Sequence, residues 1–334
     1  MILTYKIKHE QDFSEHLRKA KKIAQYAIKH RSFSSKDVKH IGLPSAISNQ
    51  ILRKYGKDRK TKNVHNVVMR VPSQGIKYAD NKITITCLKF SFAFDKPCEK
   101  VNSIEIGKEF CYVSVTVKEE AQIQPNGYIG IDRNATSHIA VCAMPNGKVM
   151  KLGKMAQHTR NKYKAIRKQM QKKVKFTKLK TIKRRESNII RDVNHKISRK
   201  VVNTAKAQGL GIKMEKLEGI RKTRKQTKTF KGTLHSWSFY QLQQFIEYKA
   251  KLLGVPVLYI DPAYTSQKCS RCGQIGNRNG KKFECVCCGH VDHADVNAAF
   301  NIAKTQPLVA SMVNCIQKDD VCKGSSDAPQ KAML

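Results

Sequence analysis

Two pairs of cysteines in the last third of the chain constrain the fold more than any other feature. Cys269 and Cys272 form one C-x-x-C pair, and Cys285 and Cys288 form a second pair after a twelve-residue loop. Four thiolates at this spacing can surround one ion at about 2.3 Å, the geometry of structural zinc. A glycine follows each pair and permits a tight turn. A disulfide or redox cluster is the alternative, disfavoured because nothing in the sequence indicates export. The pattern therefore predicts a zinc ribbon.

The charge of the chain predicts a polyanionic partner. Of 334 residues, 65 are Lys or Arg and 25 are Asp or Glu, which gives a net charge of +40. Nucleic acid is favoured over a membrane, because the sequence shows no long apolar helix and no lipidation signal. Met1–His9 is too short and too polar for a signal peptide, so we expect a cytoplasmic protein, nucleoid-associated in a prokaryote, and favour a monomer.

The first 121 residues mix helical and strand patterns. Residues 1–7 alternate as a strand does, whereas residues 11–30 and 44–55 have helical periodicity. Between 64 and 120, strands are predicted for three segments rich in Val, Ile, Thr and aromatic residues: VHNVVMRV, KITITCLKFSFAF and FCYVSVTVK. We interpret residues 1–121 as a small β-barrel with a helical insert at about 10–60. Nucleic-acid binding is one role for such a basic barrel, and a plain scaffold is the other.

A new domain begins at about residue 122 with a β-meander. Strands are predicted at 128–133, 138–144 and 148–152, with a turn at Pro145–Gly147. Asp132 lies at the end of the first strand among isoleucines and valines. A carboxylate buried there is costly unless it is paired or bound to a metal, although acids at strand ends are often exposed.

Residues 154–208 predict two antiparallel helices with an exceptional density of basic side chains. Basic stretches are usually solvated faces, but this density repels itself unless phosphates neutralise it. The candidate nucleic-acid contacts are Lys172, Lys173, Arg184 and Arg185.

The remaining pattern alternates strands and helices. Glu215 lies on a short strand, and strand alternation turns Glu218 to the other face, so at most one of them serves the site of Asp132. A mobile loop is predicted at 221–232, a helix at 235–253, a strand before the ribbon, and a helix that Asp295 opens. Residues 311–334 are predicted to be a disordered tail.

This order of elements is that of an RNase H-like sheet, and the predicted fold class is α+β with several domains. In that architecture, acids from the first strand, the fourth strand and the last helix converge, which brings together Asp132, Glu215 and Asp295. Three converging carboxylates repel one another unless cations lie between them, and Mg²⁺ prefers such oxygen ligands. A pair of Mg²⁺ ions about 3.5–4 Å apart can promote phosphodiester hydrolysis.

Several motifs also resemble a known family. They are GIDRN around Asp132, DVNHKIS at 192–198, IKMEKL around Glu215, the segment 235–254, and TSQKCSRCG through DVNAAFNIAK. Together they resemble the TnpB (OrfB) proteins encoded by transposons, the compact relatives of type V CRISPR effectors. The resemblance is specific over about 122–304 and loose over 1–121.

The resemblance implies an RNA-guided DNA endonuclease. Residues 122–262 and 291–310 would form a RuvC-type nuclease domain, with a zinc ribbon inserted at 263–290, and residues 1–121 a wedge-like domain that reads a motif beside the target. The three acids named above match the family's Mg²⁺ ligands, and the four cysteines its zinc ligands. A transposon-derived guide RNA would select the target DNA by base pairing. The chain departs from the family in its short length, its reduced helical insert and the extra thiol of Cys287.

Two other functions remain open. One is an RNA-guided DNA-binding repressor or transposon accessory protein that does not cut, although such a protein has no reason to keep three matched acids. The other is a transposase that joins strands, from which the family resemblance points away.

Overall fold

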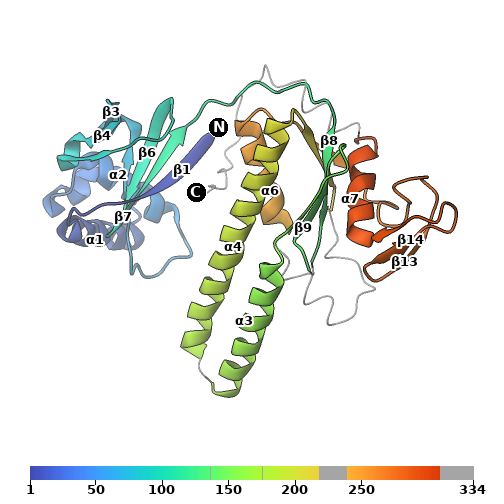
Figure 1. Ribbon diagram of the computed structural model, residues 1–334. Helices are drawn as coiled ribbons and strands as arrows, with labels where there is room; N and C mark the ends of the chain where they lie inside the picture. The colour runs from blue at the N-terminus through green and yellow to red at the C-terminus, as the bar shows by residue number, and fades with distance from the viewer. Residues whose placement is uncertain (136, 175, 218–238, 309–334) are drawn as a thin grey trace. The chain divides into compact units, whose positions relative to one another are not determined.

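The computed structural model describes residues 1–135, 137–174, 176–217 and 239–308, and the chain divides into two compact units. The first unit is Met1–Lys118, and the second begins at Glu119 (Figure 1). The predicted mobile loop at 221–232, the predicted tail and Glu218 lie outside the described residues. Within the described ranges, every helix is too short or too polar to cross a bilayer.

The first unit contains two α-helices, three short 3₁₀ helices and seven strands in its described residues. Its elements are β1 (Ile2–Lys8), α1 (Ser14–His30), α2 (Ser45–Lys57), β2 (Met69–Pro72), β3 (Ile76–Ala79), β4 (Lys82–Ile85), β5 (Phe90–Ala93), β6 (Lys100–Ile106) and β7 (Phe110–Thr116). The predicted amphipathic face of α1 is confirmed, because Ala20, Ile23, Ala24 and Ala27 are buried.

The strands of the first unit form two antiparallel sheets, with orders β1-β7-β6-β2 and β3-β4-β5. In the described residues, β1 pairs with β7 and β2 pairs with β6, so the four-stranded sheet ends in two edges that do not meet. The predicted barrel is therefore corrected: the described strands make two open sheets and no closed barrel. One cause is a 3₁₀ turn, Thr86–Leu88, which splits the apolar run at 82–94 into β4 and β5.

The second unit is built on one sheet that helices cover on both faces (Figure 1). Its elements are β8 (Tyr128–Arg133), β9 (Ala140–Ala143), β10 (Val149–Leu152), α3 (Met155–Lys172), α4 (Phe176–Ala207), β11 (Gly211–Glu215), α6 (Phe239–Leu252), β12 (Val257–Ile260), β13 (Asn277–Asn279), β14 (Lys282–Glu284), β15 (Val291–His293) and α7 (Ala294–Lys304). The predicted meander is confirmed, because β8, β9 and β10 pair antiparallel.

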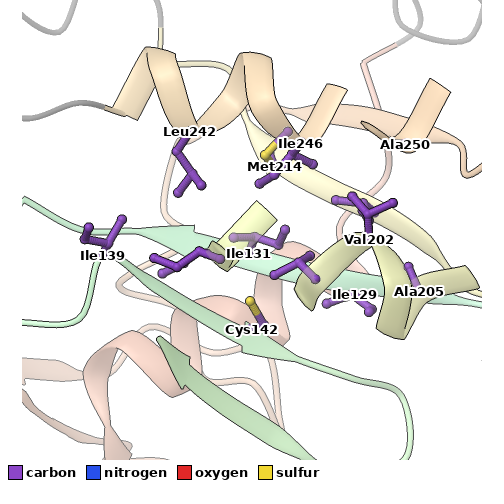
Figure 2. Packing of buried hydrophobic residues seen from close by; sticks show 14 of the residues in the cluster. Ile129, Ile131, Ile139, Cys142, Val202, Ala205, Met214, Leu242, Ile246 and Ala250 are labelled. Carbon is purple, nitrogen blue, oxygen red and sulfur yellow. The ribbon is translucent and has the colours of Figure 1, made fainter. Parts of the chain in front are cut away.

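The central sheet has the order β10-β9-β8-β11-β12, with β11 parallel to both of its neighbours. Ile129, Ile131 and Met214 face α4 and α6, where they form the main core with Val202 and Ile246 (Figure 2). On the opposite face, Val141 and Ala143 of β9 pack against Val296 and Ala299 of α7. Strand alternation therefore decides which residues face α7.

Candidate functional site

The four predicted zinc ligands form one cluster. Their Sγ atoms all lie within 4.8 Å of one another, and the Cys269–Cys288 and Cys272–Cys285 pairs are 3.6 and 3.5 Å apart. A tetrahedral ion with bonds of about 2.3 Å separates its sulfur ligands by about 3.8 Å, whereas a disulfide requires about 2.05 Å. The cluster therefore fits a zinc ion and not a pair of disulfides. Cys287 is exposed and does not belong to it.

The local fold of the ribbon explains why these cysteines converge. Gly273 and Gly289 adopt φ angles of +79° and +67°, and each donates its N–H to the carbonyl of the first cysteine of its pair. Phe283 of β14 is fully buried and packs with Cys269, Cys285 and Ala294. Because so small a ribbon has little apolar core of its own, an ion held by the four cysteines would contribute directly to its folding.

The three predicted acids lie toward the same face of the sheet. Ile131 and Met214 face α4 and α6, so their chain neighbours Asp132 and Glu215 face α7. Asp295 lies in the first turn of α7, and its side chain is fully buried. Alternation on two strands and the packing of one helix therefore place the three acids toward one face of the sheet.

Asp132 and Glu215 occupy the place where two parallel strands end. The ladder between β8 and β11 stops at the pair Ile131 and Met214, one residue before each acid. In open α/β sheets, ligands bind outside the carboxyl ends of parallel strands. The acids thus lie where such a sheet ordinarily presents its binding groups.

Gly130 allows α7 to approach β8 closely. A Cβ atom at this position would lie 2.1 Å from the carbonyl oxygen of Ala299 and 2.4 Å from the backbone nitrogen of Ala303. The backbone of α7 therefore crosses directly over the residue two positions before Asp132. This contact fixes the separation between the first turn of α7 and the end of β8.

Asp132 is buried, and the negative charges of the other two acids act on it. Burial, reinforced by the negative charges of Glu215 and Asp295, raises the pKa of Asp132 to about 7. Asn134 donates from Nδ2 to Asp132 Oδ2 at 2.9 Å and favours the ionised form, as does the charge of Arg278. A buried carboxylate facing two others is a typical position for a divalent cation.

Glu215 is half-buried and accepts a hydrogen bond from a hydroxyl group. Thr265 donates from Oγ1 to Glu215 Oε1 at 2.5 Å, while Arg133 and Arg278 add favourable charge. Burial nevertheless raises the pKa of Glu215 above its usual value.

Asp295 is paired with two cations from the ribbon. Arg278 Nη2 lies 3.3 Å from Asp295 Oδ1, and Lys281 Nζ lies 2.5 Å from Asp295 Oδ2. Among the described residues, the cysteines are the one group of three or more His, Cys, Asp or Glu side chains placed to hold a single metal ion, so the three acids do not meet around one ion. When two ions lie about 3.5–4 Å apart, oxygen ligands on their opposite sides are farther from one another than ligands of a single ion are. The spacing of the three acids is therefore compatible with two ions.

Several residues that support this site were not identified from the sequence. Asn297 and Asn301, one turn apart on α7, both donate to the carbonyl of Lys268, and Asn301 also bonds the carbonyl of Thr265. They hold the segment that leads into the ribbon against the helix that carries Asp295. Their spacing of four residues in DVNAAFN could have indicated a shared role, because residues i and i+4 lie on the same face of a helix. No sequence pattern near Arg278 indicated that it would contact Asp295.

The predicted basic hairpin is confirmed as two helices, α3 and α4, which Arg167 and Glu186 join by an ion pair. The four candidate nucleic-acid contacts are exposed on it: Lys172, Lys173, Arg184 and Arg185. The structure thus leaves these cations accessible to phosphates.

Comparisons with known proteins define the class first. The model of the Cas12f1-like TNB domain matches residues 239–302, which include α6, β12, the four cysteines and most of α7. The second unit is therefore an α+β unit that carries a Cas12f1-like TNB domain with a cysteine cluster suited to zinc.

Individual relatives are similar to parts of the chain. A CRISPR-associated endodeoxyribonuclease Cas12f1 of Sulfoacidibacillus thermotolerans is 47% identical over 114 residues, 33% of this chain and 26% of the relative. The TnpB-like protein MJ0751 of Methanocaldococcus jannaschii is 37% identical over 169 residues, 49% of this chain and 60% of the relative. A cryo-EM structure of a Cas12f1–sgRNA–target DNA complex matches 91% of this chain and 99% of its own, with 18% identity and a TM-score of 0.46.

These matches confirm the resemblance: parts of the chain are similar to TnpB-like proteins and to Cas12f1. The matched regions span 26% and 60% of the two curated relatives, less than two thirds of either.

Proposed function

We propose that this chain is an RNA-guided DNA endonuclease that hydrolyses phosphodiester bonds with two Mg²⁺ ions. The observation that carries the proposal is the gathering of Asp132, Glu215 and Asp295 on one face of the sheet, where the charges of the other two acids add to the raised pKa of Asp132. The Cas12f1 relative, which is named as an endodeoxyribonuclease, supports the same class of activity.

The proposed centre uses the three acids as ligands. When bound, two such ions supply an activated water and stabilise the leaving 3′ oxygen. Asn134 orients the Asp132 carboxylate, and Thr265 orients Glu215. Arg278 and Lys281, now paired with Asp295, are the nearest cations available to a phosphate once that acid binds metal.

In this proposal the other parts of the chain hold nucleic acid. Residues 122–262 and 291–310 form the RuvC-type domain, the zinc ribbon spans 263–290, and the 1–121 domain contributes to target recognition. The exposed cations of the α3–α4 hairpin contact phosphates of the guide RNA or of the heteroduplex. The guide is transposon-derived, and base pairing selects the target.

The test is cleavage of a plasmid that carries the sequence complementary to the RNA that copurifies with the protein. We expect Mg²⁺-dependent cutting by the wild type and loss of cutting by Asp132→Ala. Asp192→Ala is the matched control, because Asp192 is an exposed acid on α4 that forms an ion pair with Lys196.

The possible outcomes separate the candidate functions. Equal cutting by the wild type and Asp132→Ala would refute the catalytic assignment. If neither cuts although both bind the guide-matched target in a gel-shift assay, the RNA-guided repressor or accessory protein becomes the better description. Joined strands in place of cut products would indicate a transposase.

A further inference from the structure

Arg133, the last residue of β8, is a buried cation next to the proposed centre. Its exposed fraction is 3%, and strand alternation turns it toward α6, away from its neighbour Asp132. Taking a guanidinium out of water is costly, so its position requires compensating partners.

The guanidinium joins the end of β11 to α6. Arg133 donates from Nη2 to the backbone carbonyl of Glu215 and from Nη1 to Gln243 Oε1 at 2.7 Å. Because the ladder between β8 and β11 stops at Ile131 and Met214, this side chain connects the two strands where the backbone no longer does. Because Arg133 directly follows Asp132, its side chain links the backbone of β8 beside Asp132 to the backbone carbonyl of Glu215.

A second layer of contacts holds Arg133 in place. Gln243 donates from Nε2 to Glu247 Oε1 at 3.0 Å, and the Tyr259 hydroxyl donates to the same oxygen. These partners come from α6 and β12, so Arg133 is fixed from two elements besides β8 and β11. A guanidinium suits this role because its planar donors have a fixed geometry that an ammonium lacks.

We propose that Arg133 is a positioning residue that sets the separation of Asp132 and Glu215 for divalent cations, with Gln243 and Glu247 of α6 as its support. The inference rests on the proposed function, because it assigns those two acids to a metal centre. Arg133 touches the backbone of a ligand and not the ions themselves. Partners of this kind commonly change metal affinity or activity by about 10–100-fold.

The test measures Mn²⁺ affinity by calorimetry on zinc-loaded protein, together with thermal stability and the kcat and KM of plasmid cleavage. We expect Arg133→Met to weaken Mn²⁺ binding by about 10–100-fold and to lower kcat with little change in KM for DNA. Arg133→Lys restores part of the affinity, because it keeps the charge and one donor. Gln243→Ala removes one hydrogen-bond acceptor of Arg133 and weakens Mn²⁺ binding by a smaller factor. This variant tests the inference if Arg133→Met does not fold.

Lys249→Met is the matched control. Lys249 is also a buried cation, on α6, and donates to the backbone carbonyl of His195 at 2.7 Å and to Ser198 Oγ at 2.6 Å. Its loss lowers the melting temperature without changing Mn²⁺ affinity, which separates positioning from general stability.

The results distinguish the inference from the function on which it rests. If the wild type binds Mn²⁺ and cuts, and Arg133→Met binds Mn²⁺ equally well, the inference is wrong while the proposed function stands. If the wild type neither binds Mn²⁺ at the acids nor cuts, both are wrong. If Lys249→Met loses as much Mn²⁺ affinity as Arg133→Met, the role of Arg133 is general stability and the inference is wrong.

Discussion

Replacing Gly130 with alanine is the sharpest perturbation of the site that avoids its ligands. The added Cβ would lie 2.1 Å from the carbonyl oxygen of Ala299, and an ordinary contact begins at 3.4 Å, so α7 and β8 must separate by about 1.3 Å. The atoms in conflict are backbone atoms of a packed helix, which cannot rotate away. Overpacking of this kind costs about 1–3 kcal/mol.

The displacement of α7 from β8 in Gly130→Ala should reduce the rate of cleavage more than it reduces the melting temperature. Asp295 moves with α7, and a misplacement of about 1 Å at a catalytic site can reduce the rate by about 100-fold. We expect Gly130→Ala to melt several degrees lower and, below its melting temperature, to bind Mn²⁺ more weakly and to cut about 100-fold more slowly.

The assay compares melting temperature, Mn²⁺ affinity and plasmid cleavage with those of Ile131→Val. Ile131 is the next residue of β8 but packs on the α4 and α6 face, so its truncation costs about 0.5–1.5 kcal/mol without pushing α7. Wild-type stability and cleavage in Gly130→Ala would refute the claim that the contact between β8 and α7 positions Asp295.

Three further predictions concern charge and metal. Because the folded-state pKa of Asp132 lies near 7, above its ordinary 3.8, the folded protein holds this proton more tightly than the unfolded chain. Without Mg²⁺, thermal stability should therefore fall as pH rises from about 4 to about 7, and Asp132→Asn should show a smaller fall; equal slopes would contradict the burial argument. Cys269→Ser should release zinc, measured by metal analysis, and reduce cleavage, because Arg278 and Lys281 lie on the ribbon; full activity without zinc would show that the ribbon is dispensable. Replacing the four exposed hairpin cations with glutamine should lower the slope of log affinity for RNA against log salt by up to about 3–4, and an unchanged slope would exclude them as phosphate contacts.

Local patterns were sufficient to predict most of the second unit. The β8–β10 meander, the α3–α4 hairpin and the short α7 follow from alternation, helical periodicity and an acid at a helix start. The cysteine spacing alone predicted the cluster, because a C-x-x-C pair brings two sulfurs together whatever the rest of the chain does.

The first unit was predicted less completely. β3 and β6 were not identified, because IKYA is short and the charged and polar residues of KVNSIEI dilute its apolar alternation. Closure of the strands into a barrel depends on which edges pair, and no local pattern specifies that pairing.

The acids were predicted, but their surroundings were not. Arg278, Lys281 and Thr265 reach Asp295 or Glu215 only through tertiary folding, since 14 to 50 residues separate each partner from the acid it contacts. Arg133 is adjacent to Asp132 in sequence, yet its role depends on the carbonyl of Glu215, 82 residues away.

The most direct test of the proposed centre is a crystal structure of the zinc-loaded protein soaked in Mn²⁺, with diffraction recorded at the manganese absorption edge. We predict anomalous peaks between Asp132, Glu215 and Asp295, with Lys281 displaced from the Asp295 carboxylate, and no such peaks in crystals of Asp132→Asn. Manganese absent from these acids at saturating concentration, with Asp295 still paired to Arg278 and Lys281, would contradict the assignment of a two-metal nuclease centre.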